Sequence, residues 1–274
     1  MRIATWNVNS LKARMERVEE WLGYATPDVL CVQETKLSDD AFPAMAFSAL
    51  GYESVHHGEG RWNGVAILSR VGIDDVVDGF APGIDADDEA RLLTATCGGV
   101  RVSTVYVPNG RAVGTEHYRH KLRWLARLRA HMAAVTTPDA DAVVCGDFNV
   151  APDDRDVWDP TECNGGTHVS PPEREALEEL KAWGLVDVLR ERHDDGGLYS
   201  WWDYRAGAFH KHLGMRIDLL LATEPLAKRL SWVLIDRNAR KGATAGRARA
   251  AHLTGAAATQ PSDHAPLVAE FEPA

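Results

Sequence analysis

The stretch Asp141–Pro152, which reads D-A-V-V-C-G-D-F-N-V-A-P, decides how we interpret the whole chain. Its apolar run from Ala142 to Cys145 predicts a fully buried strand. Gly146 breaks that strand, and the polar Asp147 and Asn149 follow. Side chains alternate along an extended chain, so these two point to the same face. One such pair is usually a turn signal, and its meaning therefore depends on how the other strands end.

Other predicted strands also carry polar residues at or near an end. They are the segments W-N-V-N (6–9), Q-E-T (33–35), R-I-D-L-L-L (216–221) and S-D-H (262–264). Each alone has a plain explanation, such as a turn, a helix cap or, for Asp218, an ion pair with Arg216. Strand ends of one sheet lie close together, and their recurrence here therefore favours a single pocket.

The residue types at these ends limit the chemistry of that pocket. Carboxylates and amides supply hard oxygen ligands, and with one histidine and no cysteine the set suits Mg²⁺ or Mn²⁺ better than Zn²⁺. Magnesium takes one or two protein carboxylates and completes its shell with water and substrate phosphate. The pattern therefore fits metal-assisted phosphodiester hydrolysis.

Composition places the chain among ordinary globular proteins. Its 274 residues are 45% hydrophobic and 26% charged, and no apolar run approaches the length of a membrane span. The N-terminal M-R-I-A-T-W-N lacks the apolar core of a signal peptide, and the four cysteines form no C-x-x-C motif. We expect a cytoplasmic protein with reduced thiols. Because no linker or repeat divides it, we predict a single α/β domain over 1–274, with helices outside packed sheets.

Charge is unevenly distributed along the chain. The net charge of −10 argues against a generic nucleic-acid coat. However, residues 74–89 hold seven acids and no base, residues 111–129 hold six bases and one acid, and residues 237–249 hold five bases and no acid. We interpret the Ala/Gly/Arg-rich segment at about 240–260 as a flexible basic loop, with a short helix at 247–253 as an alternative. Such polarity allows local anion binding.

Local patterns predict several elements that frame these segments. Apolar residues at helical spacing predict a helix over 11–22 with Ser10 as its N-cap. Further helices are expected over 115–134 and 173–183. S-W-W-D-Y (200–204) and M-R-I-D-L-L-L-A (215–222) are interpreted as strands.

Eight segments, in order along nearly the whole chain, together resemble the exonuclease III type of apurinic/apyrimidinic endonuclease. They are W-N-V-N-S-L-K-A-R (6–14), P-D-V-L-C-V-Q-E-T-K (27–36), G-V-A-I-L-S-R (64–70), Y-V-P-N-G (106–110), G-D-F-N-V-A-P (146–152), W-W-D-Y-R (201–205), M-R-I-D-L-L-L (215–221) and S-D-H-A-P (262–266). This family lies within the endonuclease/exonuclease/phosphatase superfamily. The resemblance implies a four-layered α/β sandwich, in which two packed mixed β-sheets are flanked by helices as in deoxyribonucleases.

The resemblance also implies an activity and its partners. We expect cleavage of duplex DNA 5′ to abasic sites, leaving a 3′-hydroxyl, together with 3′→5′ exonuclease and 3′-phosphatase activities. The expected cofactor is Mg²⁺, with Mn²⁺ able to substitute. The expected partner is duplex DNA with abasic sites or blocked 3′ ends, bound by a monomer that has no membrane association.

The resemblance also implies roles for individual residues, at the positions of this chain that match the family's motifs. The implied metal-site residues are Asn7, Glu34, Asp147, Asn149, Asp263 and His264, with Glu34 as the principal ligand. Asp147 corresponds to the residue that activates or positions the attacking water, and Asn149 to a donor to the phosphate. His264, oriented by Asp218, corresponds to the residue that stabilises the pentacovalent phosphate. Tyr106 corresponds to a tyrosine that contacts the phosphate. For His264 we favour an electrostatic role, and a role as general base stays open.

Other residues resemble DNA-contacting positions. Trp201, Trp202, Phe209 and Met215 correspond to the walls around a flipped abasic sugar, whose extrusion is cheap because it has no base to unstack. Ordinary core packing is the alternative for them. Arg111 and Lys121 are candidates for backbone contacts, with a solvated helix face as the alternative for Lys121.

Two features leave alternatives open. Asn9 stands where some relatives carry Asp, so a second metal site is an open question. A non-specific nuclease or another phosphodiesterase of the superfamily is the first competing function. Those enzymes generally use a second catalytic histidine near V-Y-V-P-N-G, where this chain has Tyr106. A non-catalytic binding module is the second, and the presence of Glu34, Asp147 and His264 argues against it.

Overall fold

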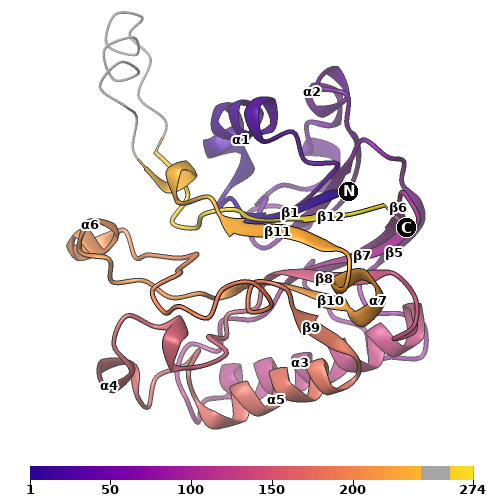
Figure 1. Cartoon of the computed structure of the whole chain (residues 1–274). Coiled ribbons are helices and arrows are strands. Elements are labelled where there is room, and N and C mark those ends of the chain that lie inside the picture. Colours follow the sequence, from indigo (N-terminus) through magenta and orange to yellow (C-terminus); the bar gives the residue numbers. More distant parts are fainter. Residues whose placement is uncertain (242–259, 274) are drawn as a thin grey trace, which may run out of the picture.

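Two β-sheets packed face to face form the centre of the molecule, and helices cover the outer face of each (Figure 1). The computed structural model describes residues 1–241 and 260–273. The layers run helix, sheet, sheet, helix, which confirms the predicted four-layered α/β sandwich. In the described ranges, no helix has the length and apolar character needed to cross a bilayer.

The first sheet contains both ends of the described chain. Its order is β11-β12-β1-β2-β4-β3. The strands are β1 (Arg2–Asn7), β2 (Val29–Gln33), β3 (Glu53–His57), β4 (Val65–Ser69), β11 (Leu230–Ile235) and β12 (Leu267–Phe271). Helices α1 (Leu11–Ala25) and α2 (Ala44–Ala49) cover it. The α1 stripe buries Val18, Trp21 and Leu22, and the Ser10 side chain accepts from the Ala13 amide as the predicted cap.

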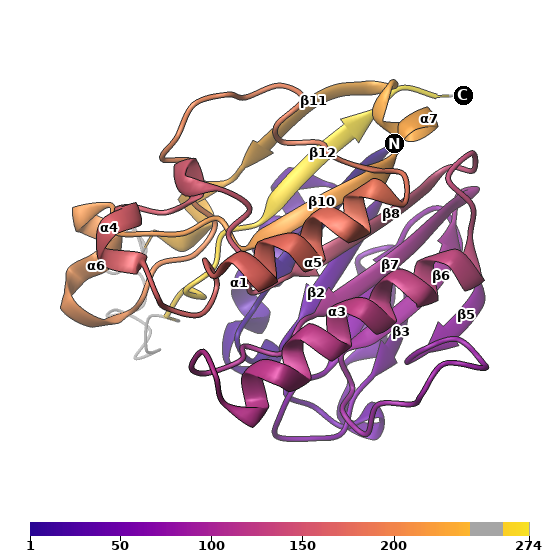
Figure 2. The ribbon, with the colours of Figure 1, turned by 90° about the horizontal axis from the view of Figure 1, so that it is seen from below.

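The second sheet has the order β5-β6-β7-β8-β10-β9. Its strands are β5 (Asp74–Asp78), β6 (Leu92–Cys97), β7 (Val100–Tyr106), β8 (Ala142–Asp147), β9 (Leu185–Asp187) and β10 (Asp218–Thr223). Helices α3 (Glu116–Val135) and α5 (Pro171–Ala182) run along its outer face (Figure 2). The shorter helices are α4 (Pro160–Cys163), α6 (Ala208–Lys211), α7 (Glu224–Ala227) and the 3₁₀ turns η1 (Asp39–Ala41), η2 (Asp154–Asp156), η3 (Arg205–Gly207) and η4 (Arg237–Arg240).

Strand register brings the polar strand ends together. In the first sheet β1 and β2 are parallel, and Asn7 lies opposite Gln33. In the second sheet β7 and β8 are parallel, and Tyr106 pairs with Asp147, which in turn faces Asp218 of antiparallel β10. Parallel strands end at one edge of their sheet, so these residues gather at one end of the sandwich.

The glycine that breaks the quoted stretch is required by close backbone packing. Gly146 has a φ of 145°, and a Cβ atom at this position would lie 2.0 Å from the Val105 carbonyl oxygen. No side chain fits there without moving β7 away from β8. Gly146 therefore lets β8 stay in register up to Asp147.

Of two expectations about the later part of the chain, one is wrong and the other falls mostly on residues that the structure does not describe. S-W-W-D-Y is not a strand, because Trp201 makes only isolated bridges, to Met215 and His264. Its neighbour Trp202 bonds through its amide to the Asp263 carbonyl instead, so no single partner strand runs alongside. Most of the expected loop at about 240–260, including the alternative helix at 247–253, lies outside the described residues.

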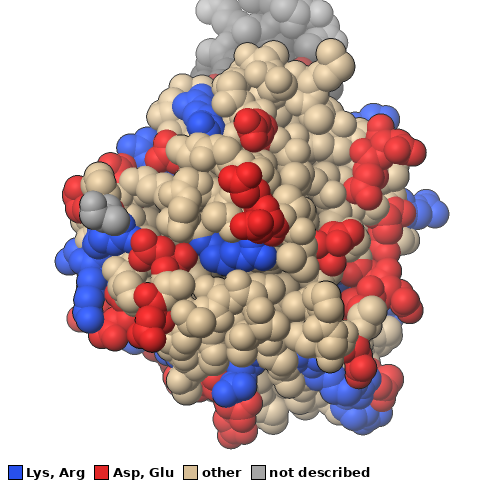
Figure 3. Space-filling model, turned by 90° about the vertical axis from the view of Figure 1, so that its right-hand side faces the viewer, with Lys and Arg blue, Asp and Glu red and all other residues tan. Residues whose placement is uncertain are grey.

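Surface charge is mixed on the side of the molecule near the two termini. Figure 3 shows Asp and Glu side chains lying among Lys and Arg on this face. The net charge of −10 is therefore not presented there as a field of one sign.

Candidate active site

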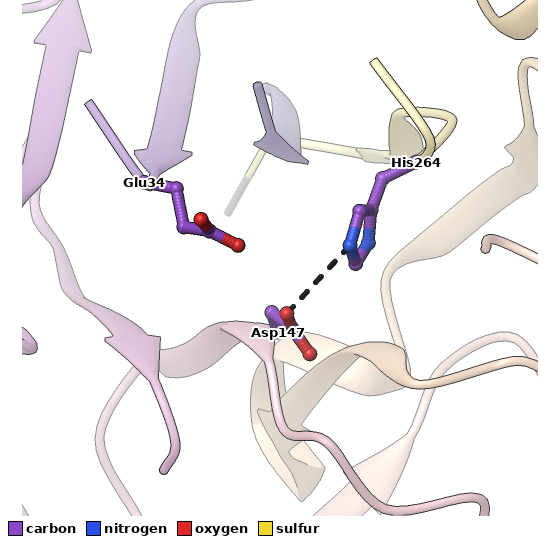
Figure 4. A group of neighbouring side chains, drawn as sticks. All are labelled: Glu34, Asp147 and His264. Atoms are coloured by element: carbon purple, nitrogen blue, oxygen red, sulfur yellow. Dashed lines mark ion pairs between the residues drawn. The ribbon is translucent and has the colours of Figure 1, made fainter. Parts of the chain in front are cut away.

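Glu34, Asp147 and His264 converge at the end of the sandwich where β2 and β8 finish (Figure 4). One ligand atom of each lies within 4.8 Å of those of the other two. Glu34 follows β2, Asp147 ends β8 and His264 precedes β12, so both sheets contribute. The His264 Nε2 atom is 3.8 Å from the Asp147 Oδ2 atom. Residues far apart in the sequence thus form one group, as the strand-end pattern predicted.

Asn7 joins the two carboxylates. Its Nδ2 group donates to Glu34 Oε1 and to Asp147 Oδ2, each at 2.9 Å. Its Oδ1 atom accepts from the Asn9 amide at 2.9 Å, which fixes the orientation of the side-chain amide. The buried Asn7 therefore holds Glu34 and Asp147 at a constant separation.

Behind this group, Asp218 holds the imidazole of His264. The His264 Nδ1 atom lies 2.8 Å from Asp218 Oδ2, and both residues are buried. Burial alone would lower the pKa of His264, but the charge and hydrogen bond of Asp218, with Asp147 nearby, raise it to about 10. The imidazole is therefore charged at neutral pH, which favours the electrostatic role over that of general base.

The alternative partner of Asp218, an ion pair with Arg216, is wrong. The Arg216 guanidinium pairs with Asp156 at 2.6 Å and with Asp187 at 2.8 Å. Arg216 lies before β10, which begins at Asp218, and its backbone amide donates to the Asp156 carbonyl at 2.8 Å, so its side chain is held beside Asp156. Asp218 is thus left to serve His264.

Asp147 is the acid most perturbed by its surroundings. Burial raises its pKa, and the nearby Asp218 and Glu34 add to this, so the pKa reaches about 7 despite the opposing charge of His264. Its Oδ1 atom accepts from the Asn149 amide at 2.9 Å. A carboxyl that ionises near neutral pH is suited to accept a proton from water.

The donor set fits a divalent cation of the magnesium type. Glu34 and Asp147 offer carboxylate oxygens beside one histidine, and burial and repulsion between acids oppose ionisation of Asp147. A cation near both carboxylates removes that repulsion. Oxygen donors are what Mg²⁺ and Mn²⁺ prefer.

Tyr106 and Asn149 complete the wall of a pocket of about 210 Å³. Burial, with Glu34 and Asp147 close by, holds the pKa of the Tyr106 phenol well above its usual range, so it stays a neutral donor. Asn149 has a φ of 51° and donates from Nδ2 to the Val107 carbonyl at 2.9 Å. Both predicted residues therefore face the same space as the carboxylates.

Sequence reasoning missed two polar residues of this pocket, Asn109 and His168. Asn109 donates from Nδ2 to Asn149 Oδ1 at 3.2 Å. The His168 Nδ1 atom lies 2.5 Å from the Asn149 carbonyl oxygen, and burial beside Lys121 lowers the pKa of His168 to about 4. Asn109 was inside a quoted motif, but His168 lies in the irregular G-G-T-H segment, which carries no periodic signal.

Asp263 lies on the outer side of the group. It accepts from Asn9 Nδ2 at 2.9 Å and from Trp201 Nε1 at 3.1 Å. Asp263 itself lines the pocket beside Trp201, while the tight acid–histidine group consists of Glu34, Asp147 and His264.

The four candidates for a wall around an abasic sugar divide between pocket and core. Trp201 is partly buried and lines the pocket, and the partly buried Met215 pairs with it. Trp202 is completely buried, and Phe209 is 8% exposed in the same cluster. For Trp202 and Phe209 the core-packing alternative applies, because a buried ring offers no surface to DNA.

The two basic candidates also differ. Lys121 is neither a DNA contact nor on a solvated helix face, because it is completely buried and pairs with the buried Glu173. It lies on the apolar stripe of α3, three residues after Tyr118 and three before Trp124. Arg111 is exposed and lines a second pocket, of about 600 Å³, that shares Tyr106 and Asn109 with the first.

Comparison with known proteins agrees with this fold and site. Residues 4–264 match the Endonuclease/Exonuclease/phosphatase family. The exodeoxyribonuclease III of Haemophilus influenzae is 30% identical, over 99% of this chain and 100% of that one. An AP endonuclease structure from Archaeoglobus fulgidus is 38% identical with a TM-score of 0.89 and covers 100% of both chains. The 3′-5′ exonuclease NExo from Neisseria meningitidis is 39% identical with a TM-score of 0.90, over 99% and 100%.

The chain therefore belongs to the Endonuclease/Exonuclease/phosphatase family. Its similarity to exodeoxyribonuclease III and AP endonuclease, over nearly the full length, makes it a hydrolytic nuclease of that type.

Proposed function

We propose that this nuclease repairs DNA by hydrolysing the phosphodiester bond 5′ to an abasic site, leaving a 3′-hydroxyl. The observation that carries the proposal is the Glu34–Asp147–His264 group, with Asp218 behind the histidine, in one pocket. The AP endonuclease and exodeoxyribonuclease names of its relatives support the substrate class.

The residues of the site have complementary roles in this reaction. Asp147 accepts the proton of the attacking water as the water oxygen bonds to phosphorus and the bond from phosphorus to the 3′-oxygen breaks. The departing 3′-oxygen takes a proton from solvent to become the 3′-hydroxyl. Charged His264, held by Asp218, faces the negative charge that grows on the phosphate oxygens. Tyr106 and Asn149 orient the phosphate. When bound by Glu34 with Asn7 beside it, Mg²⁺ supplies Lewis-acid stabilisation of the phosphate and the departing oxygen.

We also propose that the same pocket processes blocked 3′ ends, as a 3′→5′ exonuclease and 3′-phosphatase. The similarity to a protein described as a 3′-5′ exonuclease supports this second activity. We propose Mg²⁺ as the ion, replaceable by Mn²⁺, and a monomer that acts in the cytoplasm. The described cysteines are all free thiols, which agrees with a reducing compartment.

An end-labelled duplex with one abasic-site analogue tests the endonuclease, and a nicked duplex with a 3′-phosphate tests end processing. We expect a single Mg²⁺-dependent nick 5′ to the lesion and release of phosphate from the blocked end. EDTA and the variant Asp147→Asn should abolish both. Internal cleavage of undamaged duplex at similar rates, or cleavage of a non-nucleic-acid phosphodiester instead, would contradict the proposal and favour another phosphodiesterase of the family.

A further inference from the structure

Lys36 is a cation in contact with a carboxylate of the active-site group. Its Nζ atom lies 2.9 Å from Glu34 Oε2 and 2.6 Å from Asn9 Oδ1. The Lys36 side chain is 27% exposed and that of Glu34 is 16% exposed, so their ion pair is partly shielded from water. The other oxygen of Glu34 accepts from Asn7 at 2.9 Å. Glu34 therefore has one oxygen on the side of Asp147 and the other held by an ammonium group.

Asn9 extends this contact to the next carboxylate. Its Oδ1 atom faces Lys36, and its Nδ2 group donates to Asp263 Oδ1 at 2.9 Å. Lys36 and Asn9 thus form a continuous bridge between Glu34 and Asp263. A second divalent cation in a two-metal site needs carboxylates from both sides. Here an ammonium and an amide donor occupy the space between those carboxylates.

The backbone builds this arrangement at a conformational cost. Asn9, Glu34 and Lys36 all have left-handed φ values, of 46°, 53° and 54°. The Ser10 amide donates to the Glu34 carbonyl at 2.7 Å, and the Lys36 amide donates to the Asn63 carbonyl at 3.0 Å. Non-glycine residues keep such conformations only where surrounding contacts impose them, and they cluster at functional sites. The placement of Lys36 over Asn9 is therefore imposed by both loops.

We propose that Lys36 and Asn9 take the place of a second divalent cation, so that the active site binds one ion. Lys36 is a positioning residue that acts through Glu34: it holds one carboxylate oxygen and leaves the other for the ion. The inference rests on the proposed metal-dependent function and extends it to the number of ions. Because a positive group stands beside the ion site, it also weakens ion binding by repulsion.

Mn²⁺ binding to the full-length protein without DNA tests the proposal by electron paramagnetic resonance and calorimetry. We expect one ion per wild-type chain. Lys36→Met should bind that ion more tightly, by about tenfold, because the repulsion is removed. Lys36→Met combined with Asn9→Asp should bind two ions, and Lys36→Arg should behave as wild type. Lys228→Met is the matched control, because it breaks a Lys–Glu pair on distant α7.

Two ions in the wild type, weaker binding by Lys36→Met, or one ion in the double variant would each overturn the proposal. Weaker Mn²⁺ binding by Lys36→Met, in particular, would mean that Lys36 only holds the Glu34 side chain in place. If Lys36→Met does not fold, Lys36→Gln takes its place with the same expected result. The nicking assay on the wild type separates the two levels: an inactive protein that binds one Mn²⁺ contradicts the proposed function and leaves the ion count standing.

Discussion

His264 and Asp218 are 46 residues apart in the sequence, yet Nδ1 of the imidazole lies 2.8 Å from the Asp218 carboxylate. The pair is buried, and it turns the Nε2 atom of His264 toward Asp147. A buried charged imidazole is costly unless a carboxylate compensates it. The pair therefore determines both the charge and the direction of the histidine.

Asp218→Asn should lower turnover by roughly 10² or more, because the imidazole loses the charge that keeps it protonated and oriented. Affinity for DNA should change little. Single-turnover cleavage and equilibrium binding with the abasic duplex separate the two effects, and NMR should show a lower pKa for His264. Asp203→Asn, which removes a surface partner of Arg205, is the control. Equal loss of binding and turnover would contradict this role.

The raised pKa of His264 predicts how stability depends on pH in metal-free protein. Its folded pKa is about 10 against an ordinary 6.5, so its contribution is complete below pH 6.5 and is lost as pH rises toward 10. Urea unfolding in EDTA at several pH values should show a loss on the order of a few kcal/mol across this window. The double variant Asp218→Asn with His264→Gln, in which both side chains are neutral, should lose less unfolding free energy over the same pH range. If the unfolding free energies of the wild type and of this double variant fall in parallel as pH rises, His264 is not charged in the folded protein.

Glu34→Ala should raise the Mg²⁺ concentration needed for half-maximal cleavage by about tenfold or more, because a main oxygen ligand is removed. A titration of the nicking rate against Mg²⁺ measures this. Glu178→Ala is a matched control, because Glu178 forms a surface pair with Lys181 on α5. If the Mg²⁺ titrations of Glu34→Ala and of the control variant both match that of the wild type, Glu34 is not a ligand of the ion.

Trp201 and Trp202 should respond differently to substitution. Trp201→Ala should weaken cleavage of abasic DNA while the protein stays folded, because this ring lines the pocket. Trp202→Ala should lower the free energy of unfolding by ~3–5 kcal/mol, because it leaves a cavity in the core. Chemical denaturation and steady-state cleavage of both variants test the distinction. A stable Trp202→Ala protein that has lost DNA affinity would show that our assignment of this ring to the core is wrong.

The buried Lys121–Glu173 pair ties the pocket loops together, because Lys121 also donates to the Asn149 carbonyl at 2.6 Å. Lys121→Met should destabilise the protein by ~3–5 kcal/mol, because Glu173 is left as an unpaired buried charge. Adding Glu173→Gln should recover much of that loss. Urea unfolding of the wild type, both single variants and the double variant forms a mutant cycle. Additive effects would mean that the two side chains do not interact.

Much of the fold and the chemistry follows from local sequence pattern. Alternation and helical spacing predicted α1, α3 and α5 close to their observed bounds, and polar residues at strand ends indicated a single pocket. The burial of Lys121 was not predicted although a signal existed, since Lys121 lies on the buried stripe of α3 at helical spacing from Tyr118 and Trp124. A lysine on such a stripe requires a buried partner, and that partner, Glu173, lies on another helix.

The amino-acid sequence by itself determined the α/β class with helices outside packed sheets, the polar residues at the strand ends and the oxygen-rich chemistry of the site, because these depend on periodicity and residue type. The four-layered arrangement was implied by the family resemblance. Only the tertiary structure decided which of Trp201 and Trp202 faces the pocket, that Asp218 serves His264, and that Lys36 stands between Glu34 and Asp263 through Asn9. Those relationships arise where two sheets and their loops pack against one another. No local pattern encodes a contact between residues whose separation is set by the packing of the whole domain.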